Sequence, residues 1–289
     1  MPPPILLFGA TSLSGFNLAR LFPQNIQPFV PPNSQNSWPA LNLEDPAWLK
    51  ALFSAQQPQL LIYCHAICDV GKCETAPDWA HAINVGHIHR LIATLPDAVR
   101  LVYVSSDHVF GGNGAYDEEA TPCPISVYGT TRVEAESLVL KRDRSLVLRP
   151  GLAIGPSHNG RTGHLDWLAY RHRRHLPITI IADEFRSAVW VDDLAARIMQ
   201  LAQSDATGLR HIAATQAVSR VELAAYLAQH LGIDPAFKIA SRHQQPAPHL
   251  GRVELTTAYR GERYQPLPSV LEKNIPGFDQ TVQRTLISP

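Results

Sequence analysis

The feature that most constrains the fold is a regular alternation of short apolar runs with longer amphipathic stretches over the first 150 residues. Each run is continuously apolar, which is typical of a parallel strand buried on both faces. The runs that predict strands are Ile5–Phe8, Ile26–Val30, Leu60–Cys64, Val99–Val104 and Leu146–Leu148. The stretches that predict helices are Gly15–Phe22, Asp45–Gln56, Asp78–Leu95 and Ser126–Lys141. This order predicts an α/β fold with a doubly wound parallel sheet and helices on both faces.

The alternation becomes irregular beyond Pro150. The elements expected there are a loop at Gly151–Gly163, a strand at Ile178–Ile181, a helix at Val191–Leu201, a helix that Ser219 opens with Glu222 in capping-box position, and a loop-like tail from Gln244. We therefore expect a sheet domain over residues 1–150 and a small C-terminal lobe over residues 151–289. Residues 187–212 are expected to return to the sheet domain.

Composition limits the partners that this chain can have. Its 289 residues carry 25 Lys and Arg against 25 Asp and Glu, so no general field attracts nucleic acid or an anionic membrane. The four cysteines form neither a dense disulfide framework nor the paired spacing of a zinc site, so we expect no metal. No stretch reaches the ~20 apolar residues of a membrane span, and the first apolar run is too short for a secretory signal. These observations favour a cytoplasmic protein.

The first predicted strand runs into the turn Gly9-Ala-Thr11-Ser12-Leu13-Ser-Gly15 and then into a helix. In such a turn glycines let the backbone approach a pyrophosphate, and the amides of the helix N-terminus bind its charge. The turn therefore predicts a Rossmann domain that binds NAD or NADP, and the alternative is a plain strand–turn–helix without a ligand. Ser12 replaces the middle glycine of a Gly-x-x-Gly-x-x-Gly pattern, which costs ~1 kcal/mol if the backbone must be left-handed there.

The choice between NAD and NADP stays open. No Asp or Glu follows the second predicted strand to bind the ribose hydroxyls of NAD, and no Arg or Lys is present to bind a 2′-phosphate. The loop offers the polar residues Asn33, Ser34, Gln35 and Asn36.

Polar residues that suit catalysis follow the fourth predicted strand and begin the next helix. Ser105, Ser106 and Asp107 end the strand, and Tyr128 and Arg132 share one helix face because they are four residues apart. A hydroxyl, a tyrosine and a cation beside a nicotinamide suit the reduction of a carbonyl. Ser106 then orients the carbonyl, Tyr128 donates a proton, and Arg132 lowers the pKa of the tyrosine. The alternative is a half-buried structural tyrosine.

In this order the motifs resemble the extended short-chain dehydrogenase/reductase superfamily, and within it the dTDP-4-dehydrorhamnose reductase (RmlD-like) and NAD-dependent epimerase family. Ser105–Phe110 resembles the family's Ser-Thr-Asp-Tyr-Val-Phe block, and Tyr128-Gly-Thr-Thr-Arg132 resembles its Tyr-Gly-x-Thr-Lys helix. Asp183-Glu184-Phe185 before Val191-Asp192-Asp193-Leu194 resembles its later substrate-side segment.

The resemblance implies roles for single residues. It makes Ser106, Tyr128 and Arg132 the catalytic residues, with Arg132 in place of the family lysine. It puts Asp107 and His108 on the substrate side, His108 in place of a tyrosine, and Leu152 in place of a tryptophan that holds the sugar nucleotide. The cofactor contacts that it implies are Asn42 and Leu43 at the adenine, Cys64, His65 and Ala66 at a strand end, and Tyr128 and Arg132.

Two basic features are candidates for contact with a substrate anion. Arg186 lies just before the Val-Asp-Asp segment and is the better candidate. The basic run Arg171–His175 is either a solvated helix face or a cradle for a phosphate or carboxylate.

The whole pattern predicts an NAD(P)H-dependent oxidoreductase that reduces a ketone of a sugar nucleotide or a similar small molecule. Two alternatives stay open. One is an NAD(P)-binding regulatory subunit without catalysis, because the family includes the regulatory β subunit of methionine adenosyltransferase and because arginine does not release a proton at neutral pH. The other is an NAD-dependent epimerase or dehydratase. A homodimer is a further expectation.

Overall fold

The computed structural model describes residues 4–32, 34 and 37–272. Asn33, Gln35 and Asn36 of the predicted ribose-binding loop, and the end of the predicted lobe from residue 273, lie outside the described residues. Among the residues described, no helix combines the length and the apolar character that crossing a membrane requires.

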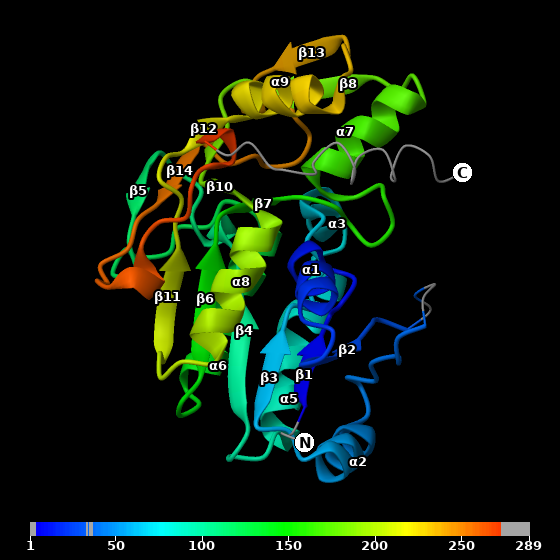
Figure 1. The fold of residues 1–289 in the computed structure, drawn as a ribbon, viewed down its shortest axis with the longest axis vertical. Coiled ribbons are helices and arrows are strands. Elements are labelled where there is room, and N and C mark those ends of the chain that lie inside the picture. The colour runs from blue at the N-terminus through cyan, green and yellow to red at the C-terminus, as the bar shows by residue number, and fades with distance from the viewer. Residues whose placement is uncertain (1–3, 33, 35–36, 273–289) are drawn as a thin grey trace.

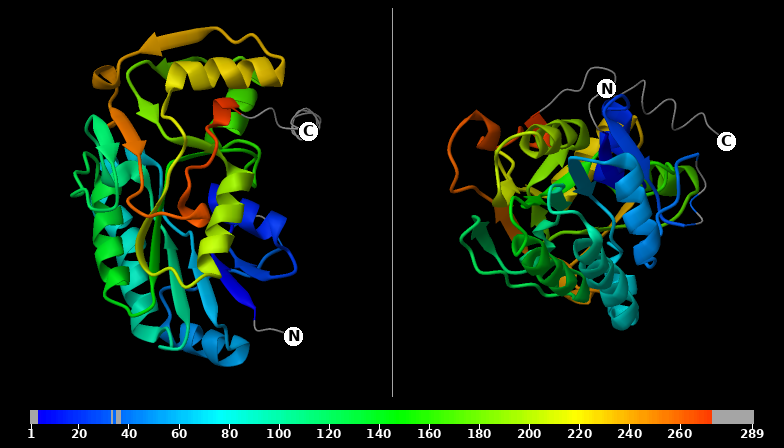
Figure 2. Two further views of the ribbon diagram at one scale, coloured as in Figure 1. Left: turned by 60° about the vertical axis from the view of Figure 1, so that its left-hand side comes forward. Right: turned by 90° about the horizontal axis from the view of Figure 1, so that it is seen from below.

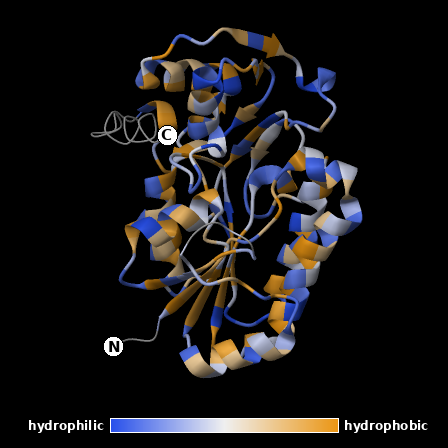
Figure 3. Cartoon of the chain, turned by 90° about the vertical axis from the view of Figure 1, so that its right-hand side faces the viewer, coloured by the Kyte–Doolittle hydropathy of each residue, from blue (hydrophilic) through white to orange (hydrophobic). Residues whose placement is uncertain are grey.

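Six strands form one parallel sheet in the order β11-β6-β4-β3-β1-β2. They are β1 (Ile5–Phe8), β2 (Ile26–Phe29), β3 (Leu60–Tyr63), β4 (Arg100–Val104), β6 (Leu146–Pro150) and β11 (Gly208–Ile212). All five strands predicted in the first 150 residues are present, so the predicted doubly wound parallel sheet is confirmed. Helices lie on both faces of this sheet (Figures 1 and 2), and its strands are largely apolar (Figure 3).

Two separate apolar cores fix these helices to the sheet. On one face pack α1 (Leu13–Leu21) and α8 (Val191–Ala202). On the other pack α2 (Pro46–Gln56), α5 (His87–Thr94) and α6 (Val127–Leu140). Of the elements within residues 187–212, α8 packs on this sheet and β11 is its edge strand, whereas β10 (Ala188–Trp190) pairs with β7 (Leu152–Ile154) outside it.

The prediction of one continuous α-helix over Asp78–Leu95 is wrong. This stretch is divided into α4 (Pro77–His81), a π-helical segment (Ala82–Gly86) and α5. A short helix that was not predicted, α3 (Val70–Thr75), precedes it. The π-helical segment lies against the start of α6, so this irregularity is close to the predicted catalytic residues.

The chain passes from β2 to β3 on the other side of β1, so the switch point of the sheet lies between β1 and β3. Gly9 follows β1 with φ 91°, and a Cβ there would lie 2.4 Å from the backbone nitrogen of His65. Only glycine lets the turn after β1 approach β3 this closely. The predicted cofactor turn therefore lies at the place where sheets of this kind bind ligands.

The lobe lies beyond the carboxyl ends of the sheet strands (Figure 1). Its helices are α7 (Gly163–Arg173) and α9 (Arg220–Leu231), and the capping box of Ser219 and Glu222 at the start of α9 is confirmed. Two short parallel pairs lie here, β7 (Leu152–Ile154) with β10 (Ala188–Trp190) and β8 (Ile178–Ile181) with β13 (Phe237–Ala240). A four-stranded sheet combines β12 (Val218–Ser219), β9 (Phe185–Arg186) and β14 (Arg252–Leu255) with β5 (Gly114–Tyr116), which comes from the first 150 residues.

Two predicted loops are wrong in part. The loop expected over Gly151–Gly163 contains β7, and the loop-like tail from Gln244 contains β14. Both strands pair only with partners far away in the sequence: β7 with β10, and β14 with β5 and β9. Their local sequences are short and rich in turn residues, so tertiary pairing decides their conformation.

Candidate active site

The glycine-rich turn leads into α1 without backbone strain at Ser12. Ser12 has φ −67° and ψ 158°, an extended conformation, and its hydroxyl accepts a hydrogen bond from the Gly15 amide at 3.0 Å. The backbone at Ser12 is therefore not left-handed, so the cost considered for that case does not arise, and as an N-cap Ser12 stabilises α1 by about 1 kcal/mol. A Cβ at Gly15 would lie 2.3 Å from the carbonyl oxygen of Gly9, so this glycine keeps α1 close to the turn. Of the other turn residues, Thr11 is half-buried, and Leu13 faces Gly163 at the start of α7.

Tyr128 lies in the first turn of α6, which is fixed from several sides. The Ser126 hydroxyl accepts a hydrogen bond from the Gly129 amide at 3.1 Å, and Glu74 accepts one from the first amide of the helix at 2.7 Å. A Cβ at Gly129 would lie 2.2 Å from the carbonyl oxygen of His108. The His108 ring packs edge-on against Tyr128, with ring centroids 5.2 Å apart. The start of α6 thus directly contacts the segment after β4.

The side chains of Ser105 and Ser106, which follow β4, contact different groups. Ser105 is buried and donates a hydrogen bond to Glu136 at 2.5 Å. The hydroxyl of Ser106 accepts a hydrogen bond from the His108 amide at 3.3 Å and lies 3.2 Å from Asp107 Oδ1. Tyr128 lies close enough for the Ser106 hydroxyl to lower its pKa. Of the two serines, Ser106 is the one placed beside the tyrosine, as the sequence predicted.

Arg132 places a buried positive charge beside Tyr128. Its guanidinium lies over the ring of Tyr103 at 4.7 Å and over that of Tyr128 at 5.7 Å, and Nη2 donates to the carbonyl oxygen of Val104. Its Nε and Nη1 are buried and have no hydrogen-bond partner among the described residues. Buried donors without partners are rare, and these two suit the hydroxyl groups of a cofactor ribose. The residues present therefore fit a nicotinamide dinucleotide.

The surroundings keep the tyrosine protonated. Burial raises the pKa of Tyr128 above its usual value, and this outweighs the charge of Arg132 and the hydrogen bond of Ser106, which lower the pKa. The contribution predicted for Arg132 thus has the expected sign, but burial is larger. Burial and the charge of Arg186 lower the pKa of His108 to about 4, so this imidazole is neutral at neutral pH.

Cys64, His65 and Ala66 follow β3 beside the glycine-rich turn. Burial raises the pKa of the Cys64 thiol to about 12, although Arg132 and a hydrogen bond with Ser12 lower it. Burial lowers the pKa of His65 to about 4, and the charges of His87 and Arg132 add to this effect. Cys64 and His65 are therefore uncharged at neutral pH.

The family resemblance also suggested Asn42, Leu43 and Leu152, and these three residues differ in burial. Leu43 is buried in the core that α2 and α5 share. Asn42 beside it is exposed. Leu152 is half-buried in β7 and packs against the core of the lobe.

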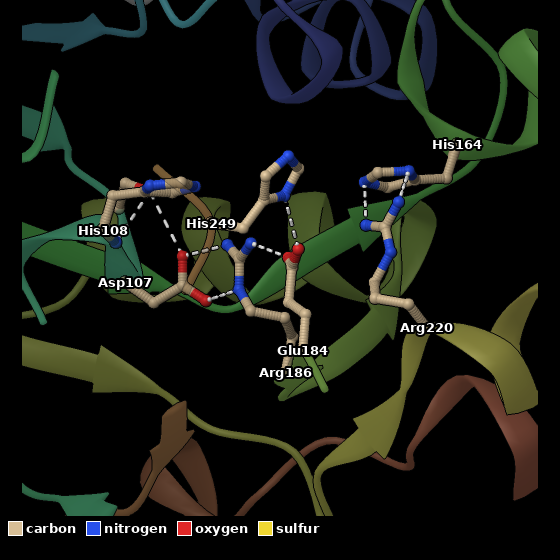
Figure 4. Close-up of polar contacts among 8 residues, drawn as sticks. Asp107, His108, His164, Glu184, Arg186, Arg220 and His249 are labelled. Atoms are coloured by element: carbon tan, nitrogen blue, oxygen red, sulfur yellow. Dashed lines mark hydrogen bonds and ion pairs between the residues drawn. The ribbon is translucent and has the colours of Figure 1, made fainter. Parts of the chain in front are cut away.

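Arg186, the predicted anchor for a substrate anion, lies in buried ion pairs (Figure 4). Its Nε donates to Asp107 Oδ2 at 2.6 Å, Nη2 donates to Asp107 Oδ1, and Nη1 donates to Glu184 Oε1 at 3.1 Å. Glu184 also contacts His249 Nδ1 at 2.9 Å. Two carboxylates compensate the guanidinium, so this geometry does not leave Arg186 available to attract an anion. Asp107, which the resemblance put on the substrate side, is held in the same pairs.

Asn84, in the π-helical segment, lies close to the predicted catalytic residues but was not among the residues predicted from the sequence. Its amide group accepts a hydrogen bond from the Ile67 backbone nitrogen at 2.8 Å and donates to Thr131 Oγ1 at 3.0 Å. It thereby ties the loop after β3 to α6, next to Arg132. Asparagine is unfavourable inside a helix, and its position in a predicted helix was the signal available.

Comparisons with known proteins identify the family and the fold of this chain. The RmlD substrate binding domain family matches residues 3–258. The chain is 26% identical over 235 residues to the dTDP-4-keto-6-deoxy-D-glucose reductase of Streptomyces niveus, covering 80% of this chain and 79% of the relative. It is 27% identical over 256 residues to methionine adenosyltransferase 2 subunit beta of Xenopus tropicalis, covering 83% and 74%. The dTDP-4-dehydrorhamnose reductase of Bacillus anthracis, solved in complex with NADP, has a TM-score of 0.80 at 21% identity, covering 99% of both chains. Because the family match spans most of the sequence, this chain belongs to the RmlD substrate binding domain family of the extended short-chain dehydrogenases/reductases.

Proposed function

We propose that the protein is an NAD(P)H-dependent reductase that acts on a ketone of a sugar nucleotide. The observation that carries this proposal is the convergence of Ser106, Tyr128 and Arg132 on the side of the sheet where the glycine-rich turn lies. The S. niveus relative is named as a reductase of such a keto sugar, and the B. anthracis neighbour binds NADP.

The residues of this chain have separable tasks in that reaction. A nicotinamide dinucleotide, when bound, supplies the hydride for the carbonyl carbon. The turn from Gly9 to Gly15 and the amides of α1 bind a pyrophosphate, and the free donors of Arg132 bind ribose hydroxyls. Ser106 orients the carbonyl by a hydrogen bond, and Tyr128 donates a proton to its oxygen as negative charge develops there.

The raised pKa of Tyr128 is consistent with its role as a proton donor. A tyrosine that donates a proton must hold it at the working pH, which burial ensures here. The charge of Arg132 then stabilises the phenolate after transfer.

A substrate screen tests the proposed function. Purified protein is incubated with NADH or NADPH and a set of keto-sugar nucleotides, and the nicotinamide absorbance and the products are followed. We expect cofactor oxidation equal to the amount of reduced sugar. Product without net oxidation would indicate an epimerase or dehydratase, and tight cofactor binding with no turnover would favour a regulatory subunit, the name that the X. tropicalis relative carries.

Substitutions of Arg132 test the role of its charge. Arg132→Lys should keep or raise turnover, whereas Arg132→Met should lower it at least about tenfold, because the phenolate of Tyr128 loses its cation. The methionine variant should also shift the alkaline limb of the rate–pH profile upward, since Tyr128 then keeps its proton to higher pH. Lys141→Met, which removes an exposed charge at the end of the same helix, is the control. An unchanged rate and profile in Arg132→Met would make Arg132 structural.

A further inference from the structure

Glu136 in α6 and Arg149 in β6 form a buried ion pair about two helical turns from Tyr128. Their side chains are 2% and 3% exposed. Arg149 Nη2 donates to Glu136 Oε2 at 2.5 Å, and its Nε contacts both carboxylate oxygens, at 3.0 and 3.1 Å. The two charges compensate each other, and the pair ties α6 to the sheet. The proposed transfer of hydride and proton uses neither residue.

This ion pair also contacts both ends of the segment that carries Ser106. At the first end, the Ser105 hydroxyl donates to Glu136 Oε1 at 2.5 Å. At the other end, the Arg149 guanidinium lies over the ring of Phe110 at 5.2 Å, and Phe110 is fully buried. Ser106 lies between these two contacts in the chain. Its position therefore depends on the ion pair, although it touches neither member.

Three successive turns of α6 lie beside three consecutive residues at the end of β4. Arg132 donates to the last carbonyl oxygen of β4, and Glu136 accepts from Ser105. Tyr128 is one turn before Arg132, and Ser106 directly follows Ser105. Residues four apart share a helix face, so the contacts of Arg132 and Glu136 set the register between α6 and β4. That register decides whether Tyr128 faces Ser106.

The Ser105 hydroxyl is not needed to compensate the charge of Glu136. Both carboxylate oxygens keep a donor from Arg149 when this hydroxyl is absent. Its hydrogen bond therefore fixes the direction of the chain at Ser105 and leaves the charge balance unchanged. The Ser105 amide also donates to the carbonyl oxygen of Leu148 in β6 at 2.7 Å. Ser105 is thus held to β6 by its backbone and to α6 by its side chain.

We propose that Ser105 and Glu136 are positioning residues that hold the Ser106 hydroxyl beside Tyr128, at the carbonyl to be reduced. Ser105 is only 6% exposed and its hydroxyl is bonded to Glu136, so it acts through its neighbour and not on the substrate. A misplaced Ser106 weakens the transition state more than the bound ground state, so the loss falls on kcat. This inference rests on the proposed function, because it gives the other serine of the pair a task in the same reaction.

A double-mutant cycle separates this role from a general loss of stability. With an accepted ketone, Ser106→Ala should lower kcat by about a hundredfold, the effect of removing a donor to the developing oxyanion. Ser105→Ala should lower kcat by about tenfold with little change in KM, since the Ser106 hydroxyl is present but misplaced. The double variant should be no slower than Ser106→Ala alone, because a positioning residue has no effect once the group that it positions is gone.

Ser145→Ala is the matched control. Ser145 is 3% exposed, and its hydroxyl donates to the carbonyl oxygen of Val139 near the other end of α6 at 2.8 Å. The control therefore also loses a buried hydrogen bond to this helix. Its urea midpoint should fall about as much as that of Ser105→Ala, whereas its kcat should stay at the wild-type value.

The hydroxyl of Tyr128 supplies a readout that needs no substrate. Tyrosine labelled at Cζ gives an NMR signal that responds to hydrogen bonding of the phenol, and Tyr128→Phe identifies the signal of Tyr128. Ser106→Ala should shift this signal, because the Ser106 hydroxyl lies beside the phenol. Ser105→Ala should shift it in the same direction, and Ser145→Ala should leave it in place.

The two readouts distinguish failure of this inference from failure of the proposed function. A wild-type rate in Ser105→Ala, a double variant slowed by the product of the two single losses, or an equal loss in Ser145→Ala would overturn the inference. If the wild type reduces no ketone, the reductase is contradicted and the NMR signal decides. A shift in Ser105→Ala but not in Ser145→Ala then supports the positioning of Ser106, and an unchanged signal overturns it.

Discussion

Tyr128→Phe should lower turnover by at least about a hundredfold while cofactor binding survives. The substitution removes only the hydroxyl that donates the proton. The ring remains, so its edge-on contact with His108 and its contact with Arg132 are kept. Loss of a proton donor weakens the transition state and not the bound ground state, so kcat should fall with little change in KM.

The measurement is steady-state oxidation of NADPH or NADH with an accepted ketone, together with a cofactor titration of both proteins. Tyr170→Phe, which removes a phenolic hydroxyl from α7 in the lobe, is the matched control and should keep full activity. If Tyr128→Phe turned over at the wild-type rate, the proton would have to come from another group and the assignment would fail.

The parts of the fold that could be predicted are those that local pattern determines. The runs Ile5–Phe8 and Ile178–Ile181 became strands with these bounds, because a short apolar run between turn residues has few alternatives. The capping box at Ser219 was visible for the same reason, since both of its partners lie within one helical turn.

The parts that could not be predicted depend on contacts between distant segments. Strand β14 lies between β9 and β5, and nothing in its own four residues indicates that pairing. The same holds for the site. Arg186 was a candidate for contact with a substrate anion in the sequence, but it pairs with Asp107, which lies 79 positions away in the chain. The glycine pattern predicted a cost at Ser12 for a left-handed backbone only. The structure has an extended backbone there, and the Ser12 side chain caps α1.

The buried pairs of Arg186 lead to the largest expected effect on stability. Arg186→Met should lower the free energy of unfolding by about 3–5 kcal/mol. Asp107 and Glu184 are only 1% and 4% exposed, so the substitution leaves two buried carboxylates without their shared cation. Methionine is also long and unbranched, so the loss of packing should be small beside the electrostatic cost.

Urea unfolding measures this loss. Arg252→Met is the matched control, because it breaks the exposed pair of Arg252 with Glu254, where about 1 kcal/mol or less is expected. Combining Arg186→Met with Asp107→Asn should recover part of the stability, since one unpaired charge is removed. Equal losses in the Arg186 and Arg252 variants would contradict the view that burial makes the Arg186 pairs important.

The same cluster predicts how stability depends on pH. Burial alone would raise the pKa of Glu184, but His249, Arg220 and Arg186 together lower it well below its usual value of 4.5. A carboxylate with a lowered pKa stabilises the fold fully above its usual pKa, and this contribution is lost as the pH falls below that value. Arg186→Met removes one of the three groups that lower the pKa. Its stability should therefore fall less steeply than that of the wild type when urea unfolding is followed downward from about pH 6 to about pH 3. Parallel curves for the two proteins over this range would mean that Arg186 does not act on Glu184.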